Sequence, residues 1–570
     1  MVGFGACYLR LLTPVPHQDG DLVNHQAALA AAAELLTGAG APPTLAGPAV
    51  AHLGLEAAAL LAEDPWALLA VENVRPEQAD ALARARISQV RPDDPRRTRA
   101  LACWLLERAA RDGHTAMGVQ QVLAAFTGIG VPNPRDALVA ALEDGSVLAF
   151  ADSEPDQSGP ADPLHAAAGR LCLERYALAE ETVAESVRRL LATRTDWPGA
   201  DQRPISDAVL AHGLVVVRTR SGYGPLAVEL AELAEQAGCL AALITPTANY
   251  DGLTGLPEPF EWFSLRRWLG EGPDPQRPLL VLAAEAHALD AEATAALLET
   301  VPDGSRVVLA GDPDQLRSAG AGDVLADLVA SGGVQVLDAP GPGEATDPLA
   351  TLVAAVRDGR LPAAGELADE SRRVVVVGCQ DAAATAHRAV QVATDSLPRV
   401  FGTTPDQVAV VGLRRRGPGG THALNRALRA ADGPTDGGLR AGDQVVVDRS
   451  VLTEGLVAGE RGRVELVEDS QVVVDLGDGS LTLDPVSAGQ LLRPGWALTA
   501  RQALGSRWQA AVVALPGDAA GSLSRELLVS AFTRGRVQLT VVTSAGPALA
   551  AAVAAPVRPP RLTRLAGLLR

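Results

Sequence analysis

Short apolar runs alternate with helix-like stretches from about residue 205 onward, and this alternation constrains the fold more than any other feature. The runs contain almost only Val, Leu, Ile and Ala, and six of them are LVVV (214–217), LAALIT (240–245), PLLVLAA (278–284), RVVLAG (306–311), RRVVVVG (372–378) and QVAVVGL (407–413). A strand with one face in water would alternate apolar and polar residues, whereas these runs do not. They predict parallel strands buried on both faces and separated by helices, which is an α/β fold.

Two other segments have a different pattern of apolar residues. Residues up to about 195 place apolar residues at intervals of three and four, which predicts helices, and the acidic stretch ADSEPDQSGPADP (151–163) predicts a loop. Between about 434 and 495, short strands such as GDQVVVD, GRVELVE and SQVVVDLGDGS lie close together with Gly-Asp turns. This pattern predicts a small antiparallel barrel, inserted where the α/β pattern pauses before WQAAVVALP and VQLTVVTS continue it.

The composition limits the partners of the chain. Its net charge is −19, and all 49 basic residues are arginine. A polyanion is repelled by such a charge at long range, so nucleic-acid binding would need a local arginine surface. Five scattered cysteines without C-x-x-C spacing argue against disulfides and zinc, and no apolar run is long enough to span a membrane. We therefore expect a cytoplasmic protein without a metal site.

Several ordered motifs resemble those of the RecD-like DNA helicases of superfamily one. LAGDPDQLRSAGAGDVLADL (309–328) resembles the third helicase motif, and VVGLRRRGPGGTHALNRALR (410–429) resembles the start of the second motor domain. ALTARQALGSRWQAAVVALP (497–516) and SRELLVSAFTRGRVQLTVV (524–542) are similar to the fifth and sixth motifs. Near the start, LLAEDPWALLAVENVRPEQADALARA (60–85) is similar to the helix-hairpin-helix segment of the family. Motifs in a fixed order are far more specific than any single match.

The resemblance implies a division of the chain. We expect a helical, helix-hairpin-helix-like domain at 1–115 and a helical or winged-helix-like connector at 116–195. Two RecA-like lobes with parallel sheets should follow, the first at 196–340 and the second at 341–433 and 496–570. Residues 434–495 should form an SH3-like barrel inserted in the second lobe.

The ATPase motifs implied by the resemblance are damaged. In a phosphate-binding loop, backbone N–H groups surround the phosphates, a Lys neutralises charge and a Ser or Thr binds Mg²⁺. Gly222 and Gly224 mark this loop, but the Lys and hydroxyl positions hold Pro225 and Leu226. In the second motif the metal-organising Asp position is Ala284. Because the chain contains no lysine, none can compensate.

Four residues of the implied nucleotide cleft remain. Glu285 stands where the family polarises the attacking water, Asp312 and Gln315 belong to the third motif, and Arg534 is the arginine-finger candidate. Without a phosphate ligand, each also has a structural interpretation. Gln315 would stabilise its turn, Glu285 would face solvent or pair with an arginine, and Arg534 would form ion pairs or contact nucleic acid.

Candidate DNA contacts are spread over three segments. Arg414, Arg415 and Arg416 form the best basic patch, and the stretch TPTAN contributes Thr245 and Thr247 at a position where the family contacts DNA. In the N-terminal part, the stretch around Gly47 could hold a phosphate with backbone N–H groups. The second hairpin has Asn73 and Arg75 in place of glycines, so we expect its tight turn to be lost.

Three functions are compatible with these observations. The first is a helicase-derived protein that binds DNA, single-stranded and weakly, or a protein partner in DNA processing, without hydrolysing ATP and without a cofactor. The second is a divergent but active ATP-dependent DNA helicase, which would use ATP and Mg²⁺. The third is a protein–protein scaffold that no longer binds DNA.

Overall fold

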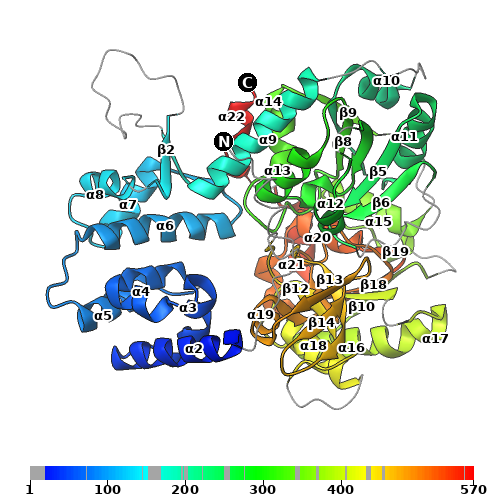
Figure 1. Ribbon diagram of the computed structural model, residues 1–570. Coiled ribbons are helices and arrows are strands. Elements are labelled where there is room, and N and C mark those ends of the chain that lie inside the picture. Colours follow the sequence, from blue (N-terminus) through cyan, green and yellow to red (C-terminus); the bar gives the residue numbers. More distant parts are fainter. Residues whose placement is uncertain are drawn as a thin grey trace.

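A computed structural model describes most of the chain (Figure 1). The described residues are 20–71, 73–143, 145–151, 169–193, 197, 203–220, 222–248, 257–274, 277–339, 347–367, 372–404, 407–431, 438–451, 456–556 and 559–570. Most of the predicted loop at 151–163 lies outside these residues.

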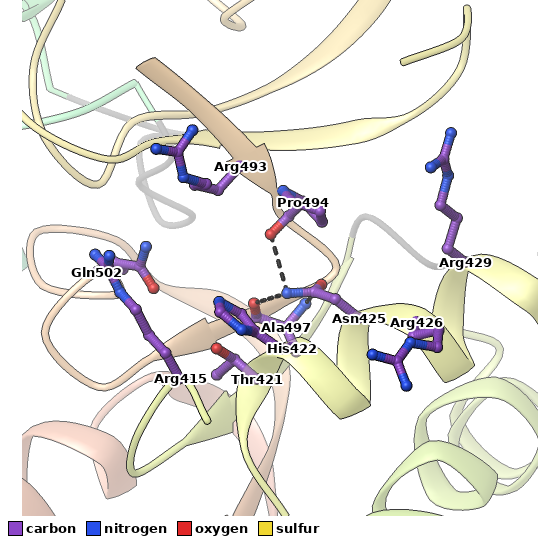
Figure 2. A pocket seen from close by; sticks show the side chains of 10 residues that line it. All are labelled: Arg415, Thr421, His422, Asn425, Arg426, Arg429, Arg493, Pro494, Ala497 and Gln502. Carbon is purple, nitrogen blue, oxygen red and sulfur yellow. Dashed lines mark hydrogen bonds between the residues drawn. The ribbon is translucent and has the colours of Figure 1, made fainter. Parts of the chain in front are cut away.

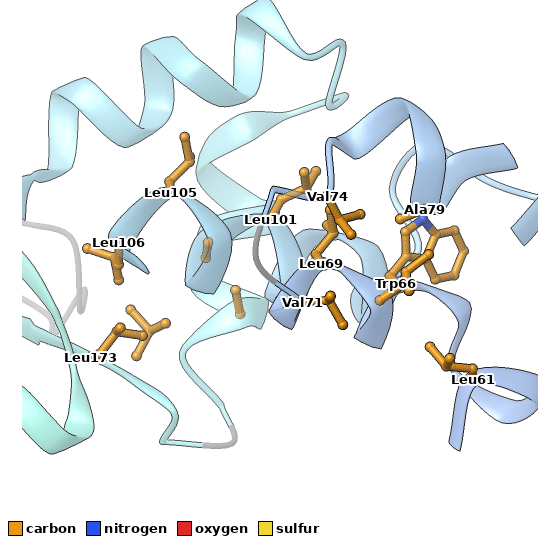
Figure 3. Packing of buried hydrophobic residues seen from close by; sticks show 14 of the residues in the cluster. Leu61, Trp66, Leu69, Val71, Val74, Ala79, Leu101, Leu105, Leu106 and Leu173 are labelled. Carbon is orange, nitrogen blue, oxygen red and sulfur yellow. The ribbon is translucent and has the colours of Figure 1, made fainter. Parts of the chain in front are cut away.

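Helices form the N-terminal part, as the apolar spacing predicts. They are α2 (Gly20–Gly38), α3 (Ala46–Leu53), α4 (Ala57–Glu63), α5 (Pro76–Arg86) and α6 (Pro95–Arg111), with the short 3-10 helices η1 (Pro43–Leu45) and η2 (Pro65–Ala70) between them. Figure 3 shows their shared core, in which Trp66 is fully buried. The Trp66 indole donates to Asp80 at 2.8 Å, and Arg97 pairs with the same carboxylate at 2.8 Å. The one polar atom of the Trp66 side chain therefore has a hydrogen-bond partner.

The second hairpin keeps its tight turn, and our expectation of its loss was wrong. Asn73 adopts φ +65°, in the left-handed region, and the Val74 N–H donates to the Val71 carbonyl at 3.2 Å across the turn. Asn enters this region more readily than other non-glycine residues because its short side chain tolerates it. Glycine is therefore not required at this position.

A small antiparallel sheet follows the N-terminal helices. Its strands β1 (Ala116–Gly118), β2 (Val147–Phe150) and β3 (Arg170–Leu173) are ordered β1-β3-β2, and they accompany helices α7 (Val119–Gly128) and α8 (Pro134–Ala141). The long helix α9 (Glu174–Ala192) then packs against α13 (Ala291–Thr300) of the next part.

The first lobe, residues 203–339, contains a parallel sheet of six strands in the order β6-β5-β7-β8-β4-β9. Its strands are β4 (Leu214–Arg218), β5 (Leu240–Thr245), β6 (Phe260–Ser264), β7 (Leu279–Ala283), β8 (Arg306–Gly311) and β9 (Gln335–Asp338). Its helices are α10 (Pro204–Ala211), α11 (Gly224–Ala237), α12 (Leu265–Glu271), α13 and α14 (Val324–Ser331). Apolar clusters cover both faces of the sheet, which is why its strands contain no alternation.

The second lobe comprises residues 347–431 and 497–556, with a parallel sheet ordered β10-β19-β18-β11-β17. Its strands are β10 (Val374–Gly378), β11 (Val408–Gly412), β17 (Ala497–Thr499), β18 (Trp508–Leu515) and β19 (Gly535–Thr543). Its helices include α15 (Pro348–Arg357), α16 (Ala382–Gln391), α17 (Leu397–Phe401), α18 (Thr421–Ala431), α20 (Arg525–Phe532) and α21 (Pro547–Ala554). Two parallel sheets with helices confirm the α/β prediction.

Between α18 and β17 the chain forms an antiparallel sheet, which we call the insert (residues 438–495). Its strands are β12 (Gln444–Val447), β13 (Arg461–Val467), β14 (Val472–Asp475), β15 (Ser480–Leu483) and β16 (Leu492–Pro494), with helix α19 (Pro485–Leu491). The order is β15-β14-β13-β12-β16, so β15 and β16 are its edge strands. The predicted antiparallel sheet is therefore present, whereas this strand order does not show a closed barrel.

Residues 559–570 return from the second lobe to the first, and we call them the strap. They include helix α22 (Leu565–Leu568), which lies beside α9 and α14 (Figure 1). Arg561 donates to the carbonyls of Ser318 and Gly322. The Leu562 carbonyl accepts from the Thr115 N–H at 3.1 Å. The strap therefore joins the N-terminal part to the first lobe.

None of the helices in the described ranges has by itself the length and apolar composition to cross a membrane. The segment Pro43–Leu53 passes that test together with Ala57–Glu63, across a bend of 99°. Residues from both segments are buried in the core of the N-terminal part.

The turn at Asn73 can be tested by substitution. Asn73→Val should destabilise the hairpin by about 1–2 kcal/mol, because a β-branched residue resists the left-handed region. Asn73→Gly should change it by less than about 1 kcal/mol. Hydrogen exchange of the amides in η2 and α5 measures this local stability. Equal protection in the Val variant and the wild type would contradict the assignment.

Candidate functional site

The carboxyl ends of strands β4, β7 and β8 meet at one edge of the first sheet, where α/β proteins bind ligands. The Thr219 N–H donates to the Gly311 carbonyl at 2.9 Å and holds the β4 and β8 ends together. Glu285 follows β7 with φ +54°, in the left-handed region. Such a conformation is costly for a residue that is not glycine, and it aims the side chain away from the strand direction.

Glu285 lies in a buried cluster of cationic groups. Its side chain is 0% exposed, and its oxygens lie 3.5 Å from Arg507 Nη2 and 3.8 Å from Arg534 Nη2. Neither oxygen has a hydrogen-bond partner among the described residues. Burial alone would raise the pKa of Glu285, but the charges of Arg534 and Arg507 outweigh it and lower this pKa below the ordinary value. The carboxylate is therefore held in its charged form.

His287 connects this cluster to the third motif. Burial lowers its pKa, despite the opposing charge of Glu285, so the ring is neutral. Its Nδ1 accepts the Asp312 N–H at 3.2 Å, which leaves the proton on Nε2, 3.4 Å from a Glu285 oxygen. His287 is thus a structural link between the β7 and β8 ends.

The turn that begins with Asp312 is held by its own side chains and by arginines. Asp312 accepts from the Asp314 N–H and from the Gln315 amide, each at 3.1 Å. Arg357 of α15 pairs with Asp312, and Arg220 pairs with Asp314 at 2.8 Å. Asp312 and Gln315 are almost fully buried. Both residues act here as internal partners of the turn.

Arg534 is fully buried and saturated with acceptors. Its guanidinium donates to Gln315 Oε1 at 2.5 Å and to the Thr533 hydroxyl at 3.0 Å. It also donates to the backbone carbonyls of Ser530 at 2.8 Å, Ser506 at 2.8 Å and Ala503 at 3.1 Å. An arginine with this many internal acceptors positions the loops around it.

The loop that contains Gly222 and Gly224 faces the same cluster. Gly222 has φ +90°, and Gly224 begins α11, with Pro225 in the first turn and Leu226 buried in the apolar core. A methyl group added at Gly222 would lie 3.5 Å from Arg507 Nη1. Arg507 therefore reaches over the loop from the second lobe while its other nitrogen faces Glu285.

Further contacts join the two lobes around this cluster. The Leu316 N–H donates to the Ser530 hydroxyl at 2.6 Å, and Arg501 donates to the Ser318 carbonyl at 2.8 Å. We call the whole set the cleft network. Its members from the first lobe are Glu285, His287, Asp312, Asp314, Gln315, Leu316 and Ser318, and those from the second are Arg357, Arg501, Arg507, Ser530 and Arg534.

Thr245 and Thr247 do not present their hydroxyls to a ligand in this structure. Both residues are fully buried. The Thr245 hydroxyl donates to the Thr247 carbonyl at 2.8 Å, and the Thr247 hydroxyl pairs with the Ser506 hydroxyl at 2.9 Å. The predicted role in binding DNA is not supported by this geometry, because internal partners occupy both groups.

The arginine run lies in the turn between β11 and α18. Arg414 pairs with Asp518 and Arg415 with Asp448, whereas Arg416 is exposed and has no ion pair within the described ranges. Gly47, the candidate in the N-terminal part, lies in the first turn of α3 with open space around its Cα. The candidates for DNA contact are therefore not gathered into one surface.

A basic pocket between α18 and the insert was not predicted. Its volume is about 500 Å³, and it is lined by Arg415, Thr421, His422, Asn425, Arg426, Arg429, Arg493, Pro494, Ala497 and Gln502 (Figure 2). The helical spacing of His422, Arg426 and Arg429 places them on one face of α18, a signal that the sequence offered. In the described part of the chain, no group of three or more His, Cys, Asp or Glu side chains is arranged to hold a metal ion.

Comparison with known proteins gives two family matches and several relatives. Residues 25–116 match the ATP-dependent RecD2 DNA helicase HHH domain, and residues 222–378 match an AAA domain. The ATP-dependent RecD2 DNA helicase of Deinococcus radiodurans is 29% identical over 549 residues, covering 89% of this chain and 73% of that protein. The RecBCD enzyme subunit RecD of Mycolicibacterium smegmatis is 28% identical over 539 residues, covering 82% and 93%.

A crystal structure of a Pif1 helicase from Bacteroides in complex with ADP-AlF3 and ssDNA covers 58% of this chain and 88% of its own. With 13% identity and a TM-score of 0.33, this likeness carries no argument about the site. Over most of its length the chain is therefore similar to RecD-like DNA helicases, and its residues 25–116 match the helix-hairpin-helix domain of RecD2 helicases.

Proposed function

We propose that this chain is a DNA-binding member of the family that does not hydrolyse ATP and acts as a binding or regulatory component in DNA processing. The observation that carries the proposal is the position of Glu285, buried between Arg507 and Arg534 inside the cleft network.

Phosphate and metal binding lack their ligands. Pro225 has no N–H to donate where the loop would approach a phosphate, and Leu226, buried in the core, cannot bind a hard cation. Ala284 replaces the carboxylate that would organise Mg²⁺ through a water molecule. One transition-state donor contributes roughly 3–4 kcal/mol, so these losses together leave little catalysis.

Glu285 is also poorly suited to act as a base. A general base works best with a pKa near the operating pH and within reach of the proton it removes. Here two arginines lower the pKa of Glu285, and the side chain has no exposed surface. In this arrangement the carboxylate neutralises Arg507 and Arg534.

The cleft network further opposes an ATPase cycle. A motor must open and close its cleft with each nucleotide turnover. In this chain, direct hydrogen bonds and ion pairs join the lobes across the cleft, and Arg534 has its donors engaged. We therefore propose a cleft that stays closed.

DNA binding is proposed from the family and from the arginine run. The named relatives are DNA helicases or RecD subunits, and Arg416, in the turn between β11 and α18, is exposed and has no ion pair among the described residues. With a net charge of −19, binding should be weak and should favour single strands. A relative is a subunit of the RecBCD enzyme, so a protein partner in DNA processing belongs to the proposal. We also propose that the insert is the counterpart of an SH3-like barrel.

The absence of turnover is the first expectation. DNA-stimulated release of phosphate from ATP should stay well below roughly 1 s⁻¹, the low end of the usual enzyme range, in both the wild type and Glu285→Gln. A colorimetric phosphate assay with a single-stranded oligonucleotide measures it. A wild-type rate above that value, lost in the Gln variant, would show an active helicase motor.

Glu285 should instead contribute to stability in a pH-dependent way. Because its folded-state pKa is lowered, its contribution is fully present above its ordinary value of 4.5 and is lost as the pH falls from there through the lower folded-state pKa. Glu285→Gln removes the carboxylate that faces the fully buried Arg534 and the partly exposed Arg507, and it should cost about 3–5 kcal/mol at pH 7. Urea unfolding at pH 7 and pH 4 measures the difference, which should shrink at the lower pH. A constant difference would contradict the ion-pair assignment.

The arginine run gives a third expectation. Replacing Arg414, Arg415 and Arg416 with alanine should weaken binding to single-stranded DNA equally across sequences. Each lost phosphate contact should reduce the slope of log affinity against log salt by roughly 0.7. Fluorescence anisotropy with a labelled oligonucleotide at several salt concentrations checks both effects. Unchanged binding would exclude this surface, and no binding at low salt would favour the scaffold alternative.

A further inference from the structure

The basic pocket between α18 and the insert is separate from the cleft network, and nothing in the proposed function uses it as a whole. Residues of α18 form one wall, and Arg493 and Pro494 of β16 form the opposite one (Figure 2). Its volume of about 500 Å³ lies within the range of small-molecule sites.

The charges around this pocket do not balance. Four arginines line it, namely Arg415, Arg426, Arg429 and Arg493. Arg415 and Arg493 share one carboxylate, Asp448, and Arg429 pairs with Asp443 at 2.5 Å. Arg426 is exposed and forms no ion pair among the residues that the structure describes. Asp443 also pairs with Arg440 at 3.0 Å. Among the described residues, the four lining arginines are thus matched by two shared carboxylates, which leaves an excess of positive charge here in a chain whose net charge is −19.

The floor of the pocket is fixed before any ligand binds. The Asn425 amide donates to the Pro494 carbonyl at 3.0 Å and to the Ala497 carbonyl at 2.9 Å, and its oxygen accepts the Ala497 N–H at 2.7 Å. All its polar atoms are therefore used to join α18 to the segment between β16 and β17. A site held by packed elements and internal hydrogen bonds loses little entropy on binding.

The chemistry of the lining selects a phosphorylated ligand. The planar guanidinium group donates paired hydrogen bonds that match phosphate oxygens. One phosphate group would fill only part of the volume, and the remaining lining offers the flat ring of His422 and the apolar surfaces of Pro494 and Ala497, which suit a base or sugar. We propose that this pocket binds a nucleotide through its phosphate groups, either as a free nucleotide or as one unit of a DNA strand.

The two sources of the nucleotide relate differently to the proposed function. Binding of a free nucleotide is independent of it, whereas binding of a strand unit rests on DNA binding. Both use the same arginines, so one set of variants tests the pocket and the choice of ligand distinguishes the sources.

Arg426→Glu is the most informative variant. Arg426 is exposed and forms no ion pair with any residue that the structure describes, so its replacement should not unfold the chain, and it adds a negative charge at the pocket wall. Arg86→Glu, an equal charge change on α5 in the N-terminal part, is the matched control. Arg493→Ala provides a second pocket variant on the opposite wall.

Isothermal titration calorimetry of the full chain at low salt should use ADP, pyrophosphate and a short oligothymidylate in separate experiments. We expect at least one probe to bind, and Arg426→Glu and Arg493→Ala to weaken that binding ten-fold or more while Arg86→Glu leaves it within two-fold. Loss of ADP and pyrophosphate binding in the pocket variants identifies a free-nucleotide site. If the pocket variants lose binding of the oligonucleotide only, the pocket is a strand-binding site.

Two results would overturn the proposal. One is the absence of binding by all three probes, and the other is binding that both pocket variants retain. Oligonucleotide binding that survives in the pocket variants but is lost in the Arg414, Arg415 and Arg416 triple variant would reject the pocket and leave the proposed DNA binding in place. Arg415 lines the pocket and also belongs to the arginine run. The pocket variants therefore leave Arg415 unchanged.

Discussion

The ion cluster around Glu285 fixes how the two lobes meet. A buried carboxylate is costly unless cations stabilise it, and here the cations come from the second lobe while the carboxylate belongs to the first. Without the second lobe, the buried Glu285 carboxylate would lose both of these cations. The same requirement fixes the third-motif turn, since Gln315 joins Arg534 to Asp312. The retained motif residues thus maintain an interface between lobes.

Under the proposed function, this arrangement explains why residues of the motor motifs persist without a nucleotide to bind. Asp312, Gln315, Glu285 and Arg534 depend on one another for hydrogen bonds and charge. Replacing one of them would leave the others buried without partners, at a cost of about 1–3 kcal/mol for a polar group and more for a charge. Pro225 and Leu226 belong to no such set, because Leu226 packs in an apolar core.

The sequence was most informative where structure depends on local patterns. Unbroken Val and Leu runs such as LVVV predicted the parallel strands, because burial on both faces requires such composition. Gly-Asp turns predicted the antiparallel insert, but the pairing of its edge strands, and hence barrel closure, is not encoded in a local pattern. The turn at Asn73 was missed because a rule about glycine was applied to a residue that can also adopt a positive φ.

Sites formed by residues far apart in the sequence were harder to predict. Glu285 was considered as a partner for an arginine, but nothing in the sequence indicated that Arg507 and Arg534 would supply the charge. Thr245 and Thr247 matched a motif, yet the Thr247 hydroxyl is occupied by Ser506, which lies 259 residues away along the chain. The pocket at α18 requires β16, about 70 residues away along the chain, to lie over the helix.

The strap affects when the first lobe can finish folding during synthesis. Leu565 belongs to the apolar core of the first lobe, and Leu562 contacts Thr115, which lies 447 residues earlier. During synthesis the first lobe therefore emerges from the ribosome long before the segment that completes its core. Contacts this far apart in sequence close slowly. Until they close, apolar surface around α9 and α14 is exposed to the surrounding solution, so a ribosome that stalls before residue 559 would release a first lobe prone to aggregation.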